Sequence, residues 1–414
     1  MQLIYFFITT IINYILKIYL YFRIFKKKED PARFKEKLAI YSIKNNYENL
    51  IWFHCASIGE LKSVFPIIDY YLEKKKFNIL VTTITLSSYK IFEKKYKKTR
   101  NIIHQFAPID SPQIVKRFFS EWRPIFIFFT ESEMWPNQIL EAKKLGIPII
   151  LINARLSQKS FKKWLIVKNF ASKILRSFNL ILCQSKESLK HFKYFNTNNV
   201  EMIGNLKFII NDNEKIVDIE NKNLINKKIF LALSTHRKEE NVCIEAHKIL
   251  KKYYPNLLTI IIPRHIDRIK EIEITVKKSQ LNYLIANSFS SIKNNYDIII
   301  VNSYGETQNY LRFSKFVFIG GSLIKHGGQN PLEVALNNSV ILHGPYVNNF
   351  FEIYEFLNNL GSSFKINSTE DLINRLKEIF NSNKVIDTKI KIKEIGKEIY
   401  NNTITKLETY LSTK

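Results

Sequence analysis

The sequence is poor in glycine and cysteine. Only 11 of its 414 residues are glycine, against an average of about 7%, which excludes collagen-like and low-complexity linker architectures. The three cysteines, Cys55, Cys183 and Cys243, lie far apart and form none of the short paired spacings that zinc sites or disulfide frameworks use. The sequence therefore predicts a protein of a reducing compartment without a structural zinc.

Acidic residues are also in short supply. Lysine and arginine number 63 and aspartate and glutamate 37, which leaves a formal net charge of +26. Such an excess points to a polyanionic partner, whether nucleic acid, anionic lipid or a phosphorylated substrate. Hydrophobic residues at 46% and aromatic residues at 14% exclude a disordered chain. At about 100 to 200 residues per domain, the length predicts two or three domains.

The longest apolar run lies at the amino terminus. Residues 2–22 carry no charge except Lys17, and a helix of that length runs about 30 Å, enough to cross a bilayer core. Arg23 and the lysines 26–28 follow it and place its carboxyl side in the cytoplasm. No small-residue cleavage site ends it, so we expect residues 1–25 to be a membrane anchor helix. Lys17 leaves open a helix that lies in the interface, and packing against the protein itself is the third interpretation.

After this segment, short β-branched or aromatic runs alternate with amphipathic helical stretches. The predicted strands are 50–54, 78–83, 101–106, 125–130, 147–152 and 179–184 in the first half, and 229–233, 257–262, 297–301, 315–319 and 339–343 in the second. Such alternation predicts parallel sheets with crossover helices. The polar stretch 209–228 is the predicted linker. We therefore expect an α/β protein of two doubly wound, Rossmann-like domains, 26–208 and 229–414, facing one another across a cleft.

Chemically distinctive residues stand where the predicted strands end, which is where open parallel sheets bind ligands. In the first half, Glu60 follows Gly59 where a strand turns into a helix, and Glu131 and Glu133 follow the strand 125–130. A carboxylate at such an edge can remove a proton from an attacking hydroxyl. A solvated glutamate in a first helical turn is the commoner situation, and it stays open for Glu60.

In the second half, four of the eleven glycines fall within residues 320–328. This loop leads into a helix, with Asn330 as its predicted cap and Pro331 in its first turn, followed by Leu332 and Glu333. Loop amides and the positive end of a helix suit a phosphate or nucleotide, and Glu333 is placed to accept hydrogen bonds from ribose hydroxyls. An ordinary tight turn with a capped helix is the alternative.

Two further loops of the second half carry candidate anion ligands. Ser234, Thr235 and His236 follow one predicted strand, and Arg264 and His265 follow the next. Hydroxyls, amides and a guanidinium that converge on one sheet edge favour a phosphate site. Ser or Thr with a glutamate a few residues on is also a plain helix-capping pattern.

The histidines do not indicate a metal site. His54, His236, His265 and His326 match no compact ligand spacing, and no aspartate pair that would hold a divalent ion is evident. A Walker-type phosphate loop and a GxGxxG fingerprint are also missing. We therefore expect neither a metal nor a cofactor.

Ten short motifs occur in order: HCASIGE, FAPID, TESEMWPN, NARLS, GNLKF, STHRKEE, PRHIDR, YGE, GGSLIKHGGQNPLE and GP. Together they resemble the Kdo transferases, which add 3-deoxy-D-manno-octulosonic acid (Kdo) to lipid A precursor. The resemblance runs from the anchor to about residue 360. It implies an inverting, metal-independent GT-B glycosyltransferase on the cytoplasmic side of the inner membrane. Its donor would be CMP-Kdo, its acceptor the lipid A precursor lipid IVA, and CMP would be released.

The resemblance also assigns roles to residues. Glu60 matches the general base that deprotonates the acceptor hydroxyl, and Glu131 and Lys207 match positions that stabilise the transition state. A lysine ammonium suits the negative charge that develops on a departing phosphate. The residues that match the CMP-binding segments are Pro263, Arg264, Tyr304, Gly305, Glu306, Asn330, Pro331, Leu332 and Glu333.

Two other functions remain as alternatives. Another GT-B glycosyltransferase with a UDP-sugar donor would share the fold and the cleft. A membrane-tethered nucleic-acid-binding protein would use the charge of +26, and it predicts basic stripes interleaved with aromatic residues. The lysines are instead scattered and the distinctive residues stand at strand ends, so we expect no nucleic-acid partner.

Overall fold

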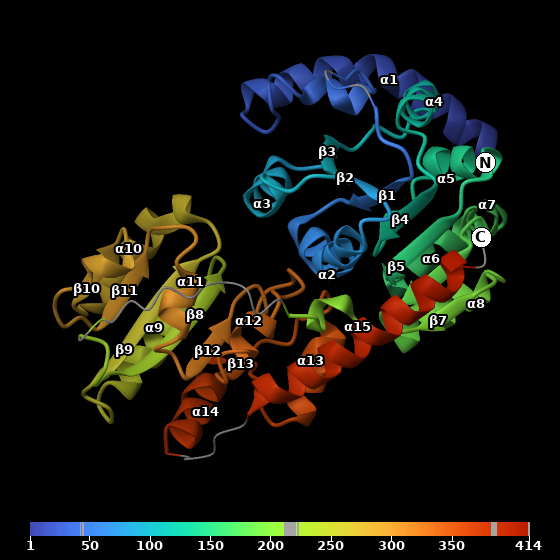
Figure 1. Cartoon of the computed structure of the whole chain (residues 1–414). Coiled ribbons are helices and arrows are strands. Elements are labelled where there is room, and N and C mark those ends of the chain that lie inside the picture. The colour runs from blue at the N-terminus through green and yellow to red at the C-terminus, as the bar shows by residue number, and fades with distance from the viewer. Residues whose placement is uncertain (42, 44, 211–220, 222, 382–386, 413–414) are drawn as a thin grey trace. The chain divides into compact units, whose positions relative to one another are not determined.

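The computed structural model describes residues 1–41, 43, 45–210, 221, 223–381 and 387–412 (Figure 1). The chain forms two compact units, one of Met1–Asp212 with Ile395–Lys414 and the other of Asn213–Glu394. Of the predicted linker 209–228, residues 211–220 and 222 lie outside the described residues. The predicted second domain ran to residue 414, whereas the structure assigns the end of the chain to the first unit.

The first unit contains a parallel sheet of seven strands in the order β3-β2-β1-β4-β5-β6-β7. The strands are β1 (Leu50–Cys55), β2 (Asn78–Thr83), β3 (Ile102–Phe106), β4 (Phe126–Thr130), β5 (Ile149–Ala154), β6 (Leu180–Cys183) and β7 (Val200–Met202). The first six were predicted. The seventh was not, because it has three residues and none of them is buried, so it lacks an apolar run.

Helices of the first unit cover both faces of this sheet (Figure 1). They are α1 (Gln2–Phe25), α2 (Ile58–Lys74), α3 (Leu86–Tyr96), α4 (Pro112–Trp122), α5 (Pro136–Lys144), α6 (Gln158–Ile166), α7 (Lys168–Leu175) and α8 (Lys186–Tyr194), with the 3-10 turns η1 (Phe34–Leu38) and η2 (Leu206–Phe208). Trp52 of β1 packs on Phe118 of α4, with ring centroids 4.5 Å apart. On the other face, Phe128 of β4 lies 6.1 Å from Tyr71 of α2. Burial on both faces explains why the strands read as continuous apolar runs.

Helix α1 packs along one side of the first unit. The Tyr5 hydroxyl donates to Asp110 over 2.8 Å, and the Asn137 amide donates to Thr9 over 3.1 Å. Its other side is apolar and exposed, as at Leu3 (83%) and Phe7 (65%). The side chain of Lys17, on which the interfacial alternative depended, is not among those described.

In the described part of the chain, no single helix is both long enough and apolar enough to cross a membrane. Two helical pieces, Gln2–Asn13 and Ile18–Phe25, which meet at 55°, together reach the length and composition of a span. The anchor therefore stays a prediction.

The second unit repeats the architecture, with a parallel sheet in the order β10-β11-β9-β8-β12-β13-β14. The strands are β8 (Lys228–Thr235), β9 (Leu257–Pro263), β10 (Tyr283–Ala286), β11 (Ile298–Val301), β12 (Phe316–Ile319), β13 (Val340–His343) and β14 (Ser363–Lys365). The helices are α9 (Glu239–Leu250), α10 (Ile269–Ser279), α11 (Thr307–Leu311), α12 (Leu332–Ala335), α13 (Phe351–Asn359) and α14 (Thr369–Asn381), with η3 (Ile266–Arg268) and η4 (Phe289–Ser291). Five strands were predicted. The edge strands β10 and β14 are short and partly exposed.

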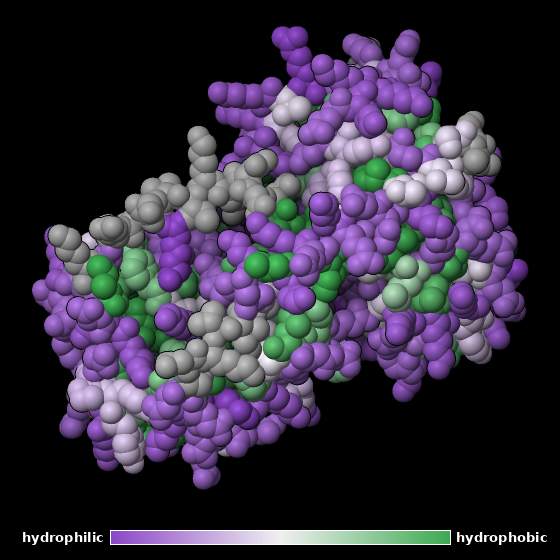
Figure 2. Space-filling model, turned by 60° about the horizontal axis from the view of Figure 1, so that its bottom comes forward, coloured by the Kyte–Doolittle hydropathy of each residue, from purple (hydrophilic) through white to green (hydrophobic). Residues whose placement is uncertain are grey.

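Most of the face drawn in Figure 2 is hydrophilic, with hydrophobic residues in scattered groups. This agrees with a charge excess that is spread along the sequence rather than gathered in one basic run.

The last helix, α15 (Thr388–Ser412), returns the chain to the first unit. Lys406 forms an ion pair of 2.7 Å with Glu201 of β7. At Gly396 the helix lies so close to η2 that an added Cβ would stand 2.3 Å from the carbonyl oxygen of Phe208. Only glycine fits this contact, which fixes the helix beside the turn that carries Lys207.

We expect Gly396→Ala to destabilise the protein, by about 1 to 3 kcal/mol, because the new methyl group overlaps the backbone of Phe208. The sign is informative, since replacing glycine by alanine inside a helix normally stabilises by about 1 kcal/mol. Thermal unfolding of the variant measures the change. Lys397→Ala, at the exposed neighbouring position, is the control, and an unfolding temperature of Gly396→Ala at or above wild type would contradict the contact.

Candidate functional site

Glu60 lies in the first turn of α2, directly after β1. Ser57 caps the helix by accepting a hydrogen bond from the Glu60 N–H over 3.3 Å. The Glu60 carboxylate reaches back, accepting from the Ala56 N–H over 2.7 Å and from the Ser57 hydroxyl over 3.0 Å. This reciprocal arrangement is close to a capping box, so the side chain is held at the carboxyl end of β1 instead of extending into solvent.

Glu131 stands immediately after β4 in a left-handed conformation, with φ of 55°. A non-glycine residue rarely adopts this conformation, and it occurs often at functional sites. Its carboxylate is 2.5 Å from the Lys207 ammonium and accepts from the Asn153 amide over 3.3 Å. The backbone also fixes it, since its N–H donates to Ile152 over 3.0 Å. Glu131 is therefore buried, paired and rigidly placed.

Lys207 comes from η2, after β7. Asn205 begins this turn and accepts from the Lys207 N–H over 3.0 Å, while the Leu206 N–H donates to Asn153 over 3.0 Å. A Cβ added to Gly59 would lie 3.9 Å from Cε of Lys207, so the lysine side chain passes beside the residue that precedes Glu60. The structure thus brings together the three residues that the resemblance assigned to catalysis.

A buried polar network supports the site from below. His54 contacts the Thr82 hydroxyl through Nδ1 over 2.8 Å and Glu133 through Nε2 over 3.3 Å. The indole N–H of Trp52 donates to Thr82 over 2.8 Å, and that of Trp135 donates to Glu133 over 2.7 Å. Because a carboxylate only accepts, a neutral His54 must carry its proton on Nε2 and accept from Thr82 at Nδ1.

Two carboxylates of this site, Glu60 and Glu133, have pKa values shifted in opposite directions. Burial raises the pKa of Glu60 to about 8, and the negative charges of Glu133 and Glu131 add to the effect. Burial also acts to raise the pKa of Glu133, but its hydrogen bonds from His54 and Trp135 outweigh it and the net shift is downward. Where the pKa values of neighbouring carboxylates differ in this way, the one with the raised pKa can accept a proton and the one with the lowered pKa stays charged. Glu60 is the group suited to accept a proton near neutral pH.

Two residues that hold this site were not identified from the sequence. Asn153 bridges Glu131 and Leu206 from its own left-handed position. Asp110 is buried and accepts from the N–H groups of Asn137 and Gln138 at the start of α5. Both belong to motifs that follow predicted strands, NARLS and FAPID, but only the packing of separate strands reveals their partners.

In the second unit, the glycine-rich loop after β12 departs from its predicted use. The carboxylate of Glu239, from α9, accepts from the N–H groups of Gly321, Ser322 and Leu323 over 2.7, 3.0 and 2.9 Å, and from that of His236 over 2.9 Å. These backbone N–H groups were predicted to bind a phosphate. They donate instead to the carboxylate of Glu239, because that residue is only 1% exposed and a buried carboxylate needs hydrogen-bond donors.

The other candidates for binding an anion around this loop are histidine and arginine side chains. His236 and His326 pack with ring centroids 4.3 Å apart, and His265 lies 5.9 Å from His236. Burial first, and then the charges of the nearby histidines, Arg264 and Arg268, together lower the pKa of His236 to about 4. Its Nε2 is buried without a hydrogen-bond partner among the described residues. An anion bound here would find a donor-rich, electropositive surface.

The other residues predicted to bind the donor substrate or its phosphate stand at the same end of the second sheet. Ser234 is left-handed, with φ of 55°, Thr235 and Pro263 are buried, and Arg264 is exposed. These four residues follow or end β8 and β9.

Two further predicted segments are adjacent to each other. Glu306 accepts from the Ser303 hydroxyl over 2.6 Å and from the Phe289 N–H over 3.2 Å, between the exposed Tyr304 and Gly305 and helix α11. Gln308 of α11 accepts from Asn337, which follows α12, over 3.4 Å. The second segment contains Asn330, Pro331, Leu332 and Glu333, of which Pro331 and Leu332 are buried and Glu333 is exposed. The Asn330 side chain accepts from the Leu332 N–H over 3.1 Å. The N-cap residue of α12 is Pro331 and not the predicted Asn330, because the helix begins one residue later, at Leu332.

Among the residues that the structure describes, no group of three or more histidine, cysteine, aspartate or glutamate side chains is arranged to hold a metal ion.

Comparisons with known proteins agree with one another. Residues 32–210 match the family model of 3-deoxy-D-manno-octulosonic-acid transferase. A 3-deoxy-D-manno-octulosonic acid transferase of Rickettsia bellii is 33% identical over 398 residues, covering 92% of this chain and 92% of that protein. One of Haemophilus influenzae is 29% identical over 337 residues, covering 79% and 78%.

Among solved structures, UDP-GlcNAc 2-epimerase from Neisseria meningitidis bound to UDP-GlcNAc aligns with a TM-score of 0.58 at 14% identity, covering 88% of this chain and 100% of that chain. At this identity the likeness is one of fold. With the two seven-stranded parallel sheets, it confirms the predicted GT-B fold.

The raised pKa of Glu60 predicts a pH-dependent stability. Because the folded state holds this proton up to about pH 8, against an ordinary value of 4.5, ionisation of Glu60 costs folding free energy as the pH rises through that window. We expect Glu60→Gln to gain stability relative to wild type between pH 5 and 8, on the order of 2 kcal/mol. Thermal unfolding across the range measures it, with the exposed Glu73→Gln of the same helix as control. A difference that is constant with pH would show that the pKa is not raised.

Proposed function

Because the chain belongs to the 3-deoxy-D-manno-octulosonic acid (Kdo) transferase family, we propose that it transfers Kdo from CMP-Kdo to the lipid A precursor lipid IVA and releases CMP. The membership agrees with the resemblance of the ten ordered motifs. The observation that carries the finer proposal is the arrangement of Glu60, Glu131 and Lys207, in which a carboxyl with a pKa of about 8 stands beside a fixed ion pair.

In this proposal Glu60 is the general base. Its ionised carboxylate removes the proton of an acceptor hydroxyl, whose oxygen attacks the anomeric carbon of Kdo as the bond to the CMP phosphate oxygen breaks. Attack opposite the leaving group inverts the anomeric configuration. A raised pKa makes Glu60 a stronger base than an ordinary glutamate, at the cost of a smaller ionised fraction at pH 7. No metal and no cofactor take part in the proposed steps.

Lys207 is proposed to stabilise the transition state. Negative charge develops on the CMP phosphate as it departs, and an ammonium held in a partly buried site is more effective there than one in water. Glu131 fixes the direction of this ammonium through the 2.5 Å ion pair. The pair is neutral as a unit, so it can be buried at a lower cost than either charge alone.

The second unit is proposed to bind the CMP part of the donor. Arg264, with Ser234, Thr235 and His236, would contact the phosphate, a role that falls to side chains because Glu239 occupies the loop amides. The exposed Tyr304 and Gly305, Glu306, and residues 330–333 would hold the ribose and base. The carboxylates of Glu306 and Glu333 are suited to accept from ribose hydroxyls.

We further propose that residues 1–25 attach the enzyme to the cytoplasmic side of the inner membrane, where the acceptor lies. The exposed apolar residues of α1, such as Leu3 and Phe7, support this location. The lysines at 26–28 would contact anionic headgroups, each contributing about 1 kcal/mol.

The reaction is tested with tetraacylated lipid A precursor and CMP-Kdo generated in the assay, by CMP release and acceptor mass. We expect Kdo mass increments with wild type, and a loss of about 10²- to 10⁴-fold in rate for Glu60→Gln. Glu73→Gln, an exposed change on the same helix, should retain the wild-type rate. Full activity in Glu60→Gln would reduce Glu60 to a helix-capping residue.

The donor is tested separately, because a UDP-sugar transferase would share the fold. We expect CMP to inhibit competitively against CMP-Kdo and UDP not to inhibit, since the proposed contacts hold a cytidine nucleotide. Excess chelator, added after the donor has formed, should leave transfer unchanged. Inhibition by UDP in place of CMP would favour the alternative donor, and loss on chelation would show a metal requirement.

A further inference from the structure

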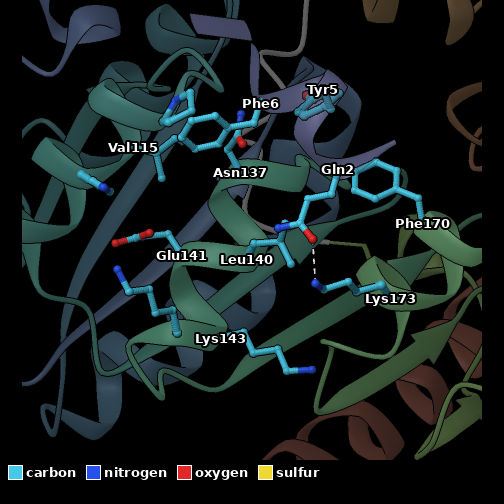
Figure 3. A pocket seen from close by; sticks show the side chains of 13 residues that line it. Gln2, Tyr5, Phe6, Val115, Asn137, Leu140, Glu141, Lys143, Phe170 and Lys173 are labelled. Atoms are coloured by element: carbon cyan, nitrogen blue, oxygen red, sulfur yellow. Dashed lines mark hydrogen bonds between the residues drawn. The ribbon is translucent and has the colours of Figure 1, made fainter. Parts of the chain in front are cut away.

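A cavity of about 440 Å³ opens between α1 and helices α4, α5 and α7 of the first unit (Figure 3). Gln2 of α1 lies over Leu140 of α5, and its amide oxygen accepts from the Lys173 ammonium over 2.6 Å. The cavity is of the size that proteins use for small ligands, about 300 to 1,000 Å³. It is lined by none of the residues assigned above to catalysis or donor binding.

The charged part of the cavity is basic. Lys116, Lys143, Lys144 and Lys173 line it, against the single carboxylate of Glu141. The first three are exposed, and their ammonium groups have no hydrogen bond or ion pair within the described part of the chain. Four ammonium groups around one carboxylate leave an excess of positive charge, which favours an anionic occupant.

The uncharged part of the lining is mixed, with Gln2, Tyr5 and Asn137 beside a set of apolar side chains. The apolar side chains include Phe6 of α1, Val115 of α4, Leu140 of α5 and Phe170 of α7. A free phosphate or a nucleotide would leave these side chains without a partner. An occupant that fits both parts of the cavity has an anionic head and a hydrocarbon portion.

The surface around the cavity indicates where such a molecule would come from. Its α1 wall continues into the exposed apolar side of the helix, where Leu3 is 83% and Phe7 65% exposed. An exposed apolar helix face followed by basic residues is typical of a helix that contacts the hydrocarbon of a membrane. A lipid at the mouth of the cavity therefore reaches it directly from a bilayer.

We propose that this cavity binds an anionic phospholipid of the membrane, with its phosphate among Lys116, Lys143 and Lys144 and the start of an acyl chain against Phe6 and Leu140. The bound lipid would hold α1 against α5. Helix α5 begins at the residues whose N–H groups bind Asp110, to which Tyr5 of α1 also donates. The lipid site thus joins the amino-terminal helix to the segment that follows Glu131 and Glu133. It is independent of the proposed reaction.

The test measures binding of dioctanoyl phosphatidylglycerol, below its micelle concentration, to the full chain in an uncharged detergent by titration calorimetry. We expect one equivalent to bind, and Lys116→Gln/Lys143→Gln/Lys144→Gln to weaken binding at least tenfold. The control carries the same change at three exposed lysines of α8, Lys186, Lys190 and Lys193, and should bind as wild type does. Phe6→Ser should also weaken binding, because the apolar wall is lost. Unfolding temperatures of all variants verify that each is folded.

Three ligand comparisons decide between sources. Dioctanoyl phosphatidylcholine should bind at least tenfold more weakly, and equal binding would show an apolar groove with no preference for an anion. Glycerol phosphate should bind more weakly still, and equal binding would reduce the cavity to a phosphate site. Displacement of phosphatidylglycerol by one equivalent of lipid A precursor would assign the cavity to the acceptor and overturn the proposal. Equal loss in both triple variants would attribute the effect to net charge alone and overturn it as well.

Discussion

The ion pair between Lys207 and Glu131 is the contact on which the site of the first unit depends. Lys207 lies in η2 and Glu131 directly follows β4. Asn153 of β5 donates to the Glu131 carboxylate and accepts from the N–H of Leu206, the residue before Lys207. Removing Lys207 would leave Glu131 buried without its counter-charge, a change that typically costs about 3 to 5 kcal/mol. Glu60 lies beside this pair and accepts hydrogen bonds from the Ala56 N–H and the Ser57 hydroxyl. Its burial, with the negative charges of Glu133 and Glu131, raises its pKa.

The second unit satisfies a buried carboxylate by different means. Four backbone N–H groups surround Glu239, three of them from the glycine-rich loop. This bonding fixes the loop against α9, and the close packing explains the glycine at 320, where a Cβ would lie 2.4 Å from the carbonyl oxygen of Ser234. The loop is thus ordered before any ligand arrives. Recognition of an anion at this edge then depends on side chains, the exposed Arg264 and the neighbouring histidines 236, 265 and 326.

The sequence was informative wherever a local pattern carries the signal. Strands buried on both faces appear as apolar runs, so the central strands were predicted, while the short or partly exposed β7, β10 and β14 were not. Glu60 and Glu131 stood out because they follow predicted strands, whereas Lys207 was assigned only through the family resemblance. The role of Glu239 was out of reach, since its pattern is that of a helix cap and its partners lie 82 to 84 residues away. The return of α15 to the first unit likewise depends on contacts between Gly396 and Phe208 that no local periodicity reports.

Two opposing influences act on the protonation of Glu60, and their balance bears on the proposal that one side chain both caps a helix and serves as a base. The Ala56 N–H, the Ser57 hydroxyl and the positive end of α2 favour its ionised form, whereas burial and the charges of Glu133 and Glu131 favour the protonated form. The second set prevails, so a proton taken up by Glu60 is retained. It cannot pass to Glu133, because that pKa is lowered, and Glu131 is committed to Lys207. In the proposed reaction, a proton that Glu60 accepts from the acceptor hydroxyl would therefore stay on Glu60 until solvent reaches the site.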